Sequence, residues 1–188
     1  KKKNLLLQNF DEHPDSTLNE SVVLSAITDT IRHSNTPGHV MISYCWHEEA
    51  KPALVKELTS HLREAYGYDV WRDEDGSALL PSMRGSTIEH MARAVELASA
   101  VIICVSRQYK ESANCRMEGV YAHQRHLKKK LEIIYVMTQE DYTTQSTAEA
   151  VDGWLGIMVA EELWYPLYNS SMVATAAKGI SQRINGRS

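Results

Sequence analysis

Two stretches of the sequence gather side chains that could bind a ligand. The first is Tyr44-Cys45-Trp46-His47, which is unusually aromatic for a turn and follows a short apolar run. The second is the segment 73–85 (DEDGSALLPSMRG), which combines acidic, glycine, proline and apolar residues over a length typical of functional loops. Aromatic rings beside a site stack on planar ligands and exclude water. Both stretches are therefore candidates for a ligand site, together with residues 106–114 and 138–147.

Familiar nucleotide and metal motifs are missing from the sequence. No GxxxxGK[ST] loop and no GxGxxG motif follows an apolar run, which argues against a P-loop enzyme and a Rossmann dehydrogenase. The stretch 73–76 (DEDG) resembles the start of a calcium loop, but the twelfth position from Asp73 is Arg84 instead of an acidic ligand. His123 and His126 would share a helix face without a partner ligand, which favours a solvated pair over a metal site. We therefore expect no bound metal and no prosthetic group.

The periodicity of apolar residues predicts the elements that must position these stretches. Residues 98–105 (ASAVIICV) form a continuous apolar run, which is typical of a strand buried on both faces of a parallel sheet. Pro166 favours an edge position for the last strand. Strands alternate with helices, so we expect a doubly wound parallel sheet of about five strands, in which ligands bind beyond the carboxyl ends of the strands. The expected strands are 39–44, 68–72, 98–105, 131–137 and 162–167, and the expected helices are 47–66, 86–97, 107–126, 148–159 and 173–184.

Composition and charge indicate one globular domain and argue against a nucleic-acid module. The 188 residues carry a formal net charge of −4, whereas binding to phosphates needs a clustered positive surface. Cys45, Cys104 and Cys115 are scattered, which favours reduced thiols in a reducing, cytoplasmic compartment. No signal-peptide pattern and no apolar run long enough to span a bilayer is present, so we expect no membrane contact of this segment. We expect a linker helix in 1–37, one domain at 38–188, and a chain that is a piece of a longer protein.

Four motifs in order are similar to those of a Toll/interleukin-receptor (TIR) domain. ISYCW resembles the first-strand signature of that family, and VWRD with the glycine-containing loop after it resembles its second strand and mobile BB loop. SAVIICVS resembles the third strand, and YKESANCRMEG resembles the stretch that follows it; DGWLGIM and ELWYPL fit the closing part of some animal members. The resemblance covers about residues 38–185 and implies a flavodoxin-like α/β fold with helices on both faces of the sheet.

The resemblance implies a reaction as well as a fold. Some TIR domains only assemble with other TIR domains, and others hydrolyse or cyclise NAD+ with a glutamate on the helix after the third strand. Glu118 occupies that position here. Cleavage of the nicotinamide–ribose bond passes through an oxocarbenium-like ion, which one carboxylate can stabilise, and nicotinamide leaves as a neutral group without a general acid. The resemblance thus implies NAD+ as the substrate and Glu118 as the catalytic residue.

The residues that would hold NAD+ follow from the same resemblance. We expect Tyr44 or Trp46 to stack on nicotinamide or adenine, the alternative for Trp46 being a lid over the core. Many enzymatic members have a tryptophan four residues before the glutamate, whereas this chain has Asn114, which would share a helix face with Glu118 and orient the ligand or the carboxylate. We expect Cys115 to be a small buried residue rather than a nucleophile. The expected binding residues are Ser43, Tyr44, Trp46, Asp73, Gly76 and Asn114, with Asp73 and Gly76 shaping the turn as the alternative.

We therefore expect an NAD+ glycohydrolase or cyclase in innate-immune or stress signalling, whose site is completed by homotypic TIR–TIR assembly. The competing hypothesis is a non-enzymatic assembly module that associates through the loop 73–85. In that case substitution of Leu80 or Pro81 would abolish signalling, while Glu118→Ala would not. A phosphorylatable receiver-type domain shares the sheet topology, but it needs acidic residues at several strand ends and a lysine after the last strand, and only 73–75 qualifies. Trp71 and Trp154 are expected to belong to the core.

Overall fold

The strands form one parallel sheet. The computed structural model describes residues 38–82, 88–147 and 149–186, and the linker helix expected in 1–37 lies outside this range. Five parallel strands are ordered β2-β1-β3-β4-β5, so the predicted α/β fold is confirmed and Pro166 lies on an edge strand as expected. The strands are β1 (His39–Ser43), β2 (Val70–Trp71), β3 (Ala98–Val105), β4 (Glu132–Met137) and β5 (Trp164–Pro166).

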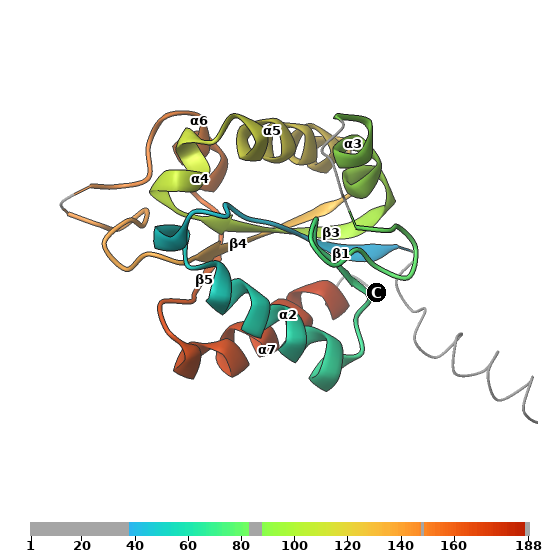
Figure 1. Cartoon of the computed structure of the whole chain (residues 1–188). Coiled ribbons are helices and arrows are strands. Elements are labelled where there is room, and N and C mark those ends of the chain that lie inside the picture. The colour runs from blue at the N-terminus through green and yellow to red at the C-terminus, as the bar shows by residue number, and fades with distance from the viewer. Residues whose placement is uncertain (1–37, 83–87, 148, 187–188) are drawn as a thin grey trace, which may run out of the picture. The chain divides into compact units, whose positions relative to one another are not determined.

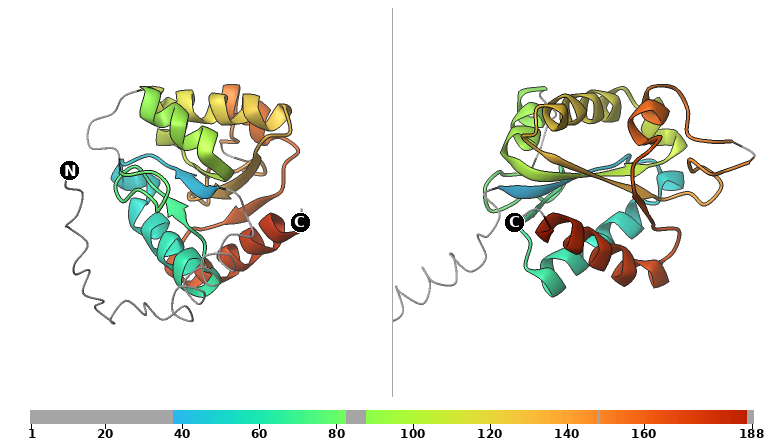
Figure 2. Two further views of the ribbon diagram at one scale, coloured as in Figure 1. Left: turned by 90° about the vertical axis from the view of Figure 1, so that its right-hand side faces the viewer. Right: turned by 180° about the vertical axis from the view of Figure 1, so that it is seen from behind.

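Helices cover both faces of the sheet (Figure 1). One face is covered by α3 (Ile88–Leu97), α4 (Arg107–Glu111), α5 (Ala113–Leu127) and α6 (Gly153–Val159), and the other by α2 (Pro52–Tyr66) and α7 (Val173–Asn185). The two views in Figure 2 show the same layers from the side and from behind.

Alternate residues of β3 belong to two separate hydrophobic cores. Val101, Ile103 and Val105 face the α3–α6 layer, and Ala100, Ile102 and Cys104 face α2 and α7. Side chains of a strand alternate between the faces, so a strand covered on both sides must be apolar throughout. The two-faced burial expected from ASAVIICV is confirmed, and so is the core position of Trp71, which is 1% exposed. Trp154 is half-buried and packs against the same core as Trp71.

Two expected helices are interrupted. The helix expected over 47–66 is a short 3₁₀ turn, η1 (Glu48–Ala50), followed by α2, because Lys51 adopts a left-handed conformation (φ 58°) before Pro52. A residue before proline avoids the helical region, and proline is favoured at the first position of a helix. The helix expected over 107–126 is divided at Ser112, whose ψ of 122° ends α4 and whose Oγ accepts a hydrogen bond from the Cys115 amide.

Other boundaries also differ from the expected ones. The strand expected over 68–72 is reduced to two residues, because β2 is an edge strand and pairs with β1 only at Val70 and Trp71. The helix expected to begin at 148 begins at Gly153 within the described residues. The strands expected over 39–44, 131–137 and 162–167 are shorter by one to three residues, and a 3₁₀ turn, η2 (Ser170–Met172), precedes α7. An apolar pattern in the sequence predicts which residues are buried, but a strand ends where its hydrogen-bonded pairing ends. The expected boundaries therefore differ from the observed ones by a few residues.

Candidate active site

A cavity of 450 Å³ lies at the carboxyl ends of β1 and β2. This volume is within the range of small-molecule sites, and this edge of a parallel sheet is where ligands bind. Its walls come from the loop after β1, the loop after β2, α3 and the beginning of α5. The lining residues are Tyr44, Cys45, Trp46, His47, Asp73, Met91, Ser112, Asn114, Cys115 and Glu118.

Glu118 supplies the carboxyl group of this cavity. It lies on the second turn of α5, and its Oε2 accepts a hydrogen bond of 2.6 Å from Oγ of Ser43, the last residue of β1. Burial raises the pKa of Glu118 to about 7, helped by the negative charge of Asp73 and opposed by the Ser43 hydrogen bond. A carboxyl with this pKa is partly ionised at neutral pH, so it can exchange a proton or stabilise a developing positive charge.

Trp46 forms part of the cavity rim instead of a lid over the core. Its side chain is 63% exposed, and its indole Nε1 donates a hydrogen bond of 2.8 Å to Oδ2 of Asp73. This bond joins the loop after β1 to the loop after β2. Burial raises the pKa of Asp73, while the hydrogen bond from Trp46 acts in the opposite direction. The exposed indole is therefore held at the cavity mouth, with its ring free to contact a ligand.

The Tyr44 side chain lies deeper in the same wall. It is 6% exposed, and the guanidinium of Arg72 lies 5.7 Å from the centre of its ring. Burial and the negative charge of Asp73 raise the pKa of Tyr44, and its hydroxyl has no hydrogen-bond partner among the described residues. A buried hydroxyl without a partner is unfavourable. Tyr44 thus offers a ligand one unused donor and acceptor.

The remaining expected binding residues divide between the cavity and its support. Asn114 is exposed and lines the cavity one helical turn before Glu118. Ser43 lies behind the wall, where it contacts Glu118. Gly76 lies outside the lining, in a turn with φ of 70°, where a Cβ atom would lie 2.4 Å from the Ser82 amide nitrogen. The geometry of Gly76 is that of a residue that shapes the loop.

Cys115 lines the cavity as a buried thiol. It is 6% exposed, and its Sγ donates a hydrogen bond of 3.6 Å to the Tyr44 carbonyl. Burial raises the pKa of this thiol to about 12, so the thiolate that a nucleophile requires is scarce at neutral pH. This agrees with the structural role expected for it.

Several residues of the site were not identified from the sequence. Tyr109 on α4 forms a hydrogen bond with Ser43, and Met91 of α3 lines one wall of the cavity. The Arg72 side chain is 1% exposed and packs against the Tyr44 ring. Tyr109 and Arg72 are within the quoted motifs YKESANCRMEG and VWRD, so their positions were visible. Their partners are distant in sequence, and no local pattern reveals those contacts.

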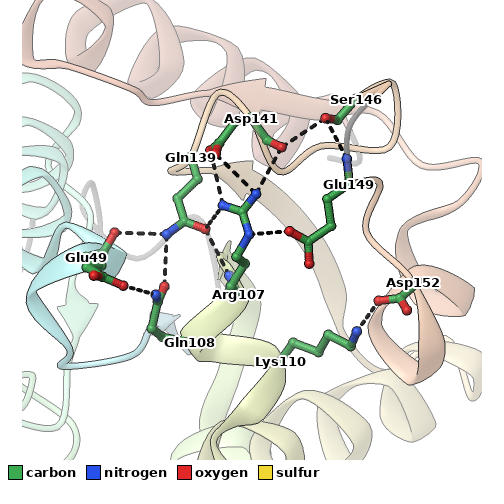
Figure 3. A network of polar contacts seen from close by, with 9 residues as sticks. All are labelled: Glu49, Arg107, Gln108, Lys110, Gln139, Asp141, Ser146, Glu149 and Asp152. Atoms are coloured by element: carbon green, nitrogen blue, oxygen red, sulfur yellow. Dashed lines mark hydrogen bonds and ion pairs between the residues drawn. The ribbon is translucent and has the colours of Figure 1, made fainter.

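A second polar cluster at the same edge of the sheet is satisfied internally (Figure 3). Arg107 donates from Nε to Glu149 at 2.7 Å and from Nη1 to Asp141 at 3.2 Å. The Gln139 amide nitrogen donates to the Glu49 carbonyl at 3.1 Å, and its Oε1 accepts from the Arg107 amide at 3.0 Å. The cluster therefore joins the loop after β4 to α4 and η1, and we assign no ligand to it.

Of the residues considered as possible metal ligands, His126 and Asp75 have other hydrogen-bond partners. His126 hydrogen-bonds the Leu131 carbonyl at 2.9 Å through Nδ1, while the buried Nδ1 of His123 has no partner among the described residues. Asp75 accepts hydrogen bonds from Arg72 and Arg63. Within residues 38–82, 88–147 and 149–186, no three potential ligands are grouped as a metal ion requires. No described helix is long and apolar enough to cross a membrane.

A family model described as TIR domain matches residues 40–160. No curated protein matches the chain. The matched range runs from β1 to the end of α6 and includes every residue that lines the cavity.

Proposed function

The chain belongs to the TIR-domain family, and on that premise we propose that it cleaves the nicotinamide–ribose bond of NAD+. The products are nicotinamide and either ADP-ribose or a cyclic ADP-ribose. One observation carries the proposal: Glu118 lines a 450 Å³ cavity at the carboxyl edge of the sheet, with its carboxyl group hydrogen-bonded to Ser43. We place the activity in cytoplasmic innate-immune or stress signalling.

The chemistry requires one carboxylate. When the bond between the ribose carbon and the nicotinamide nitrogen breaks, its electron pair goes to the nitrogen, and nicotinamide leaves as a neutral molecule. The positive charge moves to the ribose ring, where ionised Glu118 stabilises it. Water then adds its oxygen to the ribose carbon and releases a proton, or an adenine nitrogen of the same molecule attacks and closes a ring.

The other walls of the cavity suit the rest of the substrate. The Trp46 ring at the rim is positioned to stack on nicotinamide or adenine, and Asp73 and the Tyr44 hydroxyl are positioned to hydrogen-bond ribose hydroxyls. Asn114, which replaces the tryptophan of many enzymatic members, provides an amide for hydrogen bonding and no stacking surface. In this proposal the stacking contact comes from the loop after β1 instead of α5.

Chromatography of NAD+ incubated with concentrated protein tests the proposal. Wild type is expected to release nicotinamide, and Glu118→Ala to release it about 10²–10³-fold more slowly, the range for loss of one transition-state electrostatic contact. Glu64→Ala is a matched control, because Glu64 is exposed on α2, on the opposite face of the sheet. Equal release from wild type and Glu118→Ala, or no release from wild type under assembly-promoting conditions, would exclude the enzymatic function.

A non-enzymatic assembly module is the second candidate, and it is supported by exposed apolar side chains. Leu79 on the loop after β2 is 57% exposed, Ile157 on α6 is 81% exposed, and Leu163 just after α6 is 61% exposed. Large apolar side chains in water favour association with a partner. In this case such exposed side chains would mediate homotypic TIR–TIR assembly without turnover of NAD+.

A further inference from the structure

Glu118 is the end of a chain of three hydrogen-bonded side chains, of which Tyr109 and Ser43 are buried. The Tyr109 hydroxyl lies 2.8 Å from Oγ of Ser43, and that oxygen lies 2.6 Å from Oε2 of Glu118. Tyr109 is completely buried and Ser43 is 1% exposed, so water does not compete for these bonds. Tyr109 does not line the cavity, so its hydroxyl can reach the site only through Ser43.

The direction of the bonds follows from the number of protons. A serine hydroxyl has one proton, and Ser43 donates it to the Glu118 carboxylate. The Tyr109 hydroxyl must then be the donor in its bond to Ser43. A hydroxyl that accepts a hydrogen bond becomes a stronger donor, so Tyr109 strengthens the bond that favours ionised Glu118.

Independent contacts hold the Tyr109 ring in this position. Its backbone amide donates to Oγ of Ser106, which caps α4, and its ring centre lies 6.2 Å from that of Trp154. Gly119 provides the space for it on α5, because a Cβ atom there would lie 3.2 Å from the Tyr109 hydroxyl and 3.3 Å from the Trp154 ring. Glycine within a helix is less favourable than alanine, so this close approach has a cost in stability.

We propose that Tyr109 is a positioning residue for Glu118, which it orients through the hydroxyl group of Ser43. That this positioning serves catalysis rests on the proposed function of Glu118. The ring places the phenol, the phenol fixes the Ser43 hydroxyl, and Ser43 holds the carboxylate toward the cavity. Tyr109 itself touches no substrate.

The pKa of Glu118 depends on the hydrogen bonds that link it through Ser43 to Tyr109. The titratable groups around the carboxyl are Asp73 from the loop after β2, Tyr109 from α4, Cys115 from α5, and Tyr44, Cys45 and His47 from the loop after β1. Of these, Asp73 raises the pKa of Glu118, and it is unchanged in a Tyr109→Phe variant. The hydrogen bond that Ser43 donates lowers the pKa of Glu118, and loss of the phenol weakens this bond. The Glu118 carboxyl of Tyr109→Phe should therefore titrate at a higher pH than that of wild type.

The test is an NMR titration of the Glu118 side-chain carboxyl carbon in labelled protein, with Glu118→Gln to assign the signal. Tyr109→Phe is expected to raise the midpoint by roughly half a pH unit and Ser43→Ala by about one unit, the shifts that correspond to loss of a weak and a strong hydrogen bond. Gly119→Ala, which crowds the phenol without removing it, is expected to shift the midpoint in the same direction. Tyr142→Phe is the control, because it removes a buried hydroxyl that has no partner among the described residues.

The pH dependence of nicotinamide release adds a second readout. In Tyr109→Phe the acid limb of kcat should move to higher pH with the carboxyl titration, while KM stays near the wild-type value. An unshifted Glu118 titration in Tyr109→Phe and Gly119→Ala, or an equal shift in Tyr142→Phe, would overturn the inference even if wild type cleaves NAD+. A shifted titration in protein that never releases nicotinamide would leave the positioning role established and reject the proposed function.

Discussion

Ionised Glu118 destabilises the fold that contains it. Its pKa is about 7 in the folded protein against an ordinary value of 4.5, because burial disfavours the charged form. Between these two values the folded chain retains a proton that the unfolded chain has lost, so stability falls as the pH rises from about 4.5 to 7. The full effect above pH 7 is on the order of 3 kcal/mol. Retention of such a residue is typical of functional sites, where stability is lower for the sake of activity.

Glu118→Gln should therefore stabilise the protein in a pH-dependent way. Glutamine keeps an oxygen that can accept the Ser43 hydrogen bond and has no charge to bury. We expect the free energy of unfolding of the variant to exceed that of wild type by about 2–3 kcal/mol at pH 8, and the difference to be much smaller at pH 5. Urea unfolding at both pH values measures this, with Glu64→Gln as the exposed control. A difference that does not change with pH would mean that the carboxyl is not destabilised by burial.

At the scale of elements, the break at Ser112 allows Tyr109 and Glu118 to contact one side chain, that of Ser43. In one continuous helix, residues nine positions apart lie roughly 180° apart around the axis and about 13 Å apart along it. Ser112 leaves the helical conformation and caps α5, so α4 and α5 are two separate helices. No proline or glycine marks the break in the sequence, and the helix expected over 107–126 ran through it.

The loop after β2 depends on Gly76 in a way that a matched pair of variants can measure. Gly76 and Gly153 both have positive φ, 70° and 59°, but a Cβ atom at Gly76 would lie 2.4 Å from the Ser82 nitrogen, whereas at Gly153 the nearest atom is Lys110 Cε at 3.6 Å. Gly153→Ala should cost about 1–2 kcal/mol from the left-handed conformation alone. Gly76→Ala should cost clearly more, because the loop backbone must also move. Thermal unfolding of the two variants compares them, and equal losses would contradict the close packing of this turn.

At the scale of the described domain, the cavity and an exposed apolar side chain share one loop. Asp73 lines the cavity, and Leu79, six residues later, is 57% exposed. Leu80, one of the two residues expected to test assembly, is 5% exposed and packs in the core, so its substitution would damage the fold. Pro81 is exposed, and Leu79 is the better probe of an interface at this loop.

Leu79→Asp should weaken self-association, because it places a charge where an apolar contact is proposed. Sedimentation velocity over a concentration series is the measurement, with nicotinamide release followed in the same samples. Leu127→Asp is the matched control, since Leu127 is 68% exposed at the end of α5 remote from Glu118. For an enzyme completed by assembly, activity per molecule falls together with association; for an assembly module, only association changes. If both variants associate as wild type does, the loop after β2 is not the interface.

The sequence by itself determined the alternation of five strands with helices, the two-faced burial of β3, the edge position of Pro166, and the strand-end stretches that contribute to the cavity. These properties depend on residue type and spacing within one element or one motif, so they can be read locally. The tertiary structure alone decided that Ser43 receives Tyr109 from 66 residues away and reaches Glu118 75 residues away. That convergence requires the strand order, the crossovers and the break at Ser112 together. Glu118 could be located from its motif, but what holds its carboxyl and raises its pKa is a property of the folded chain.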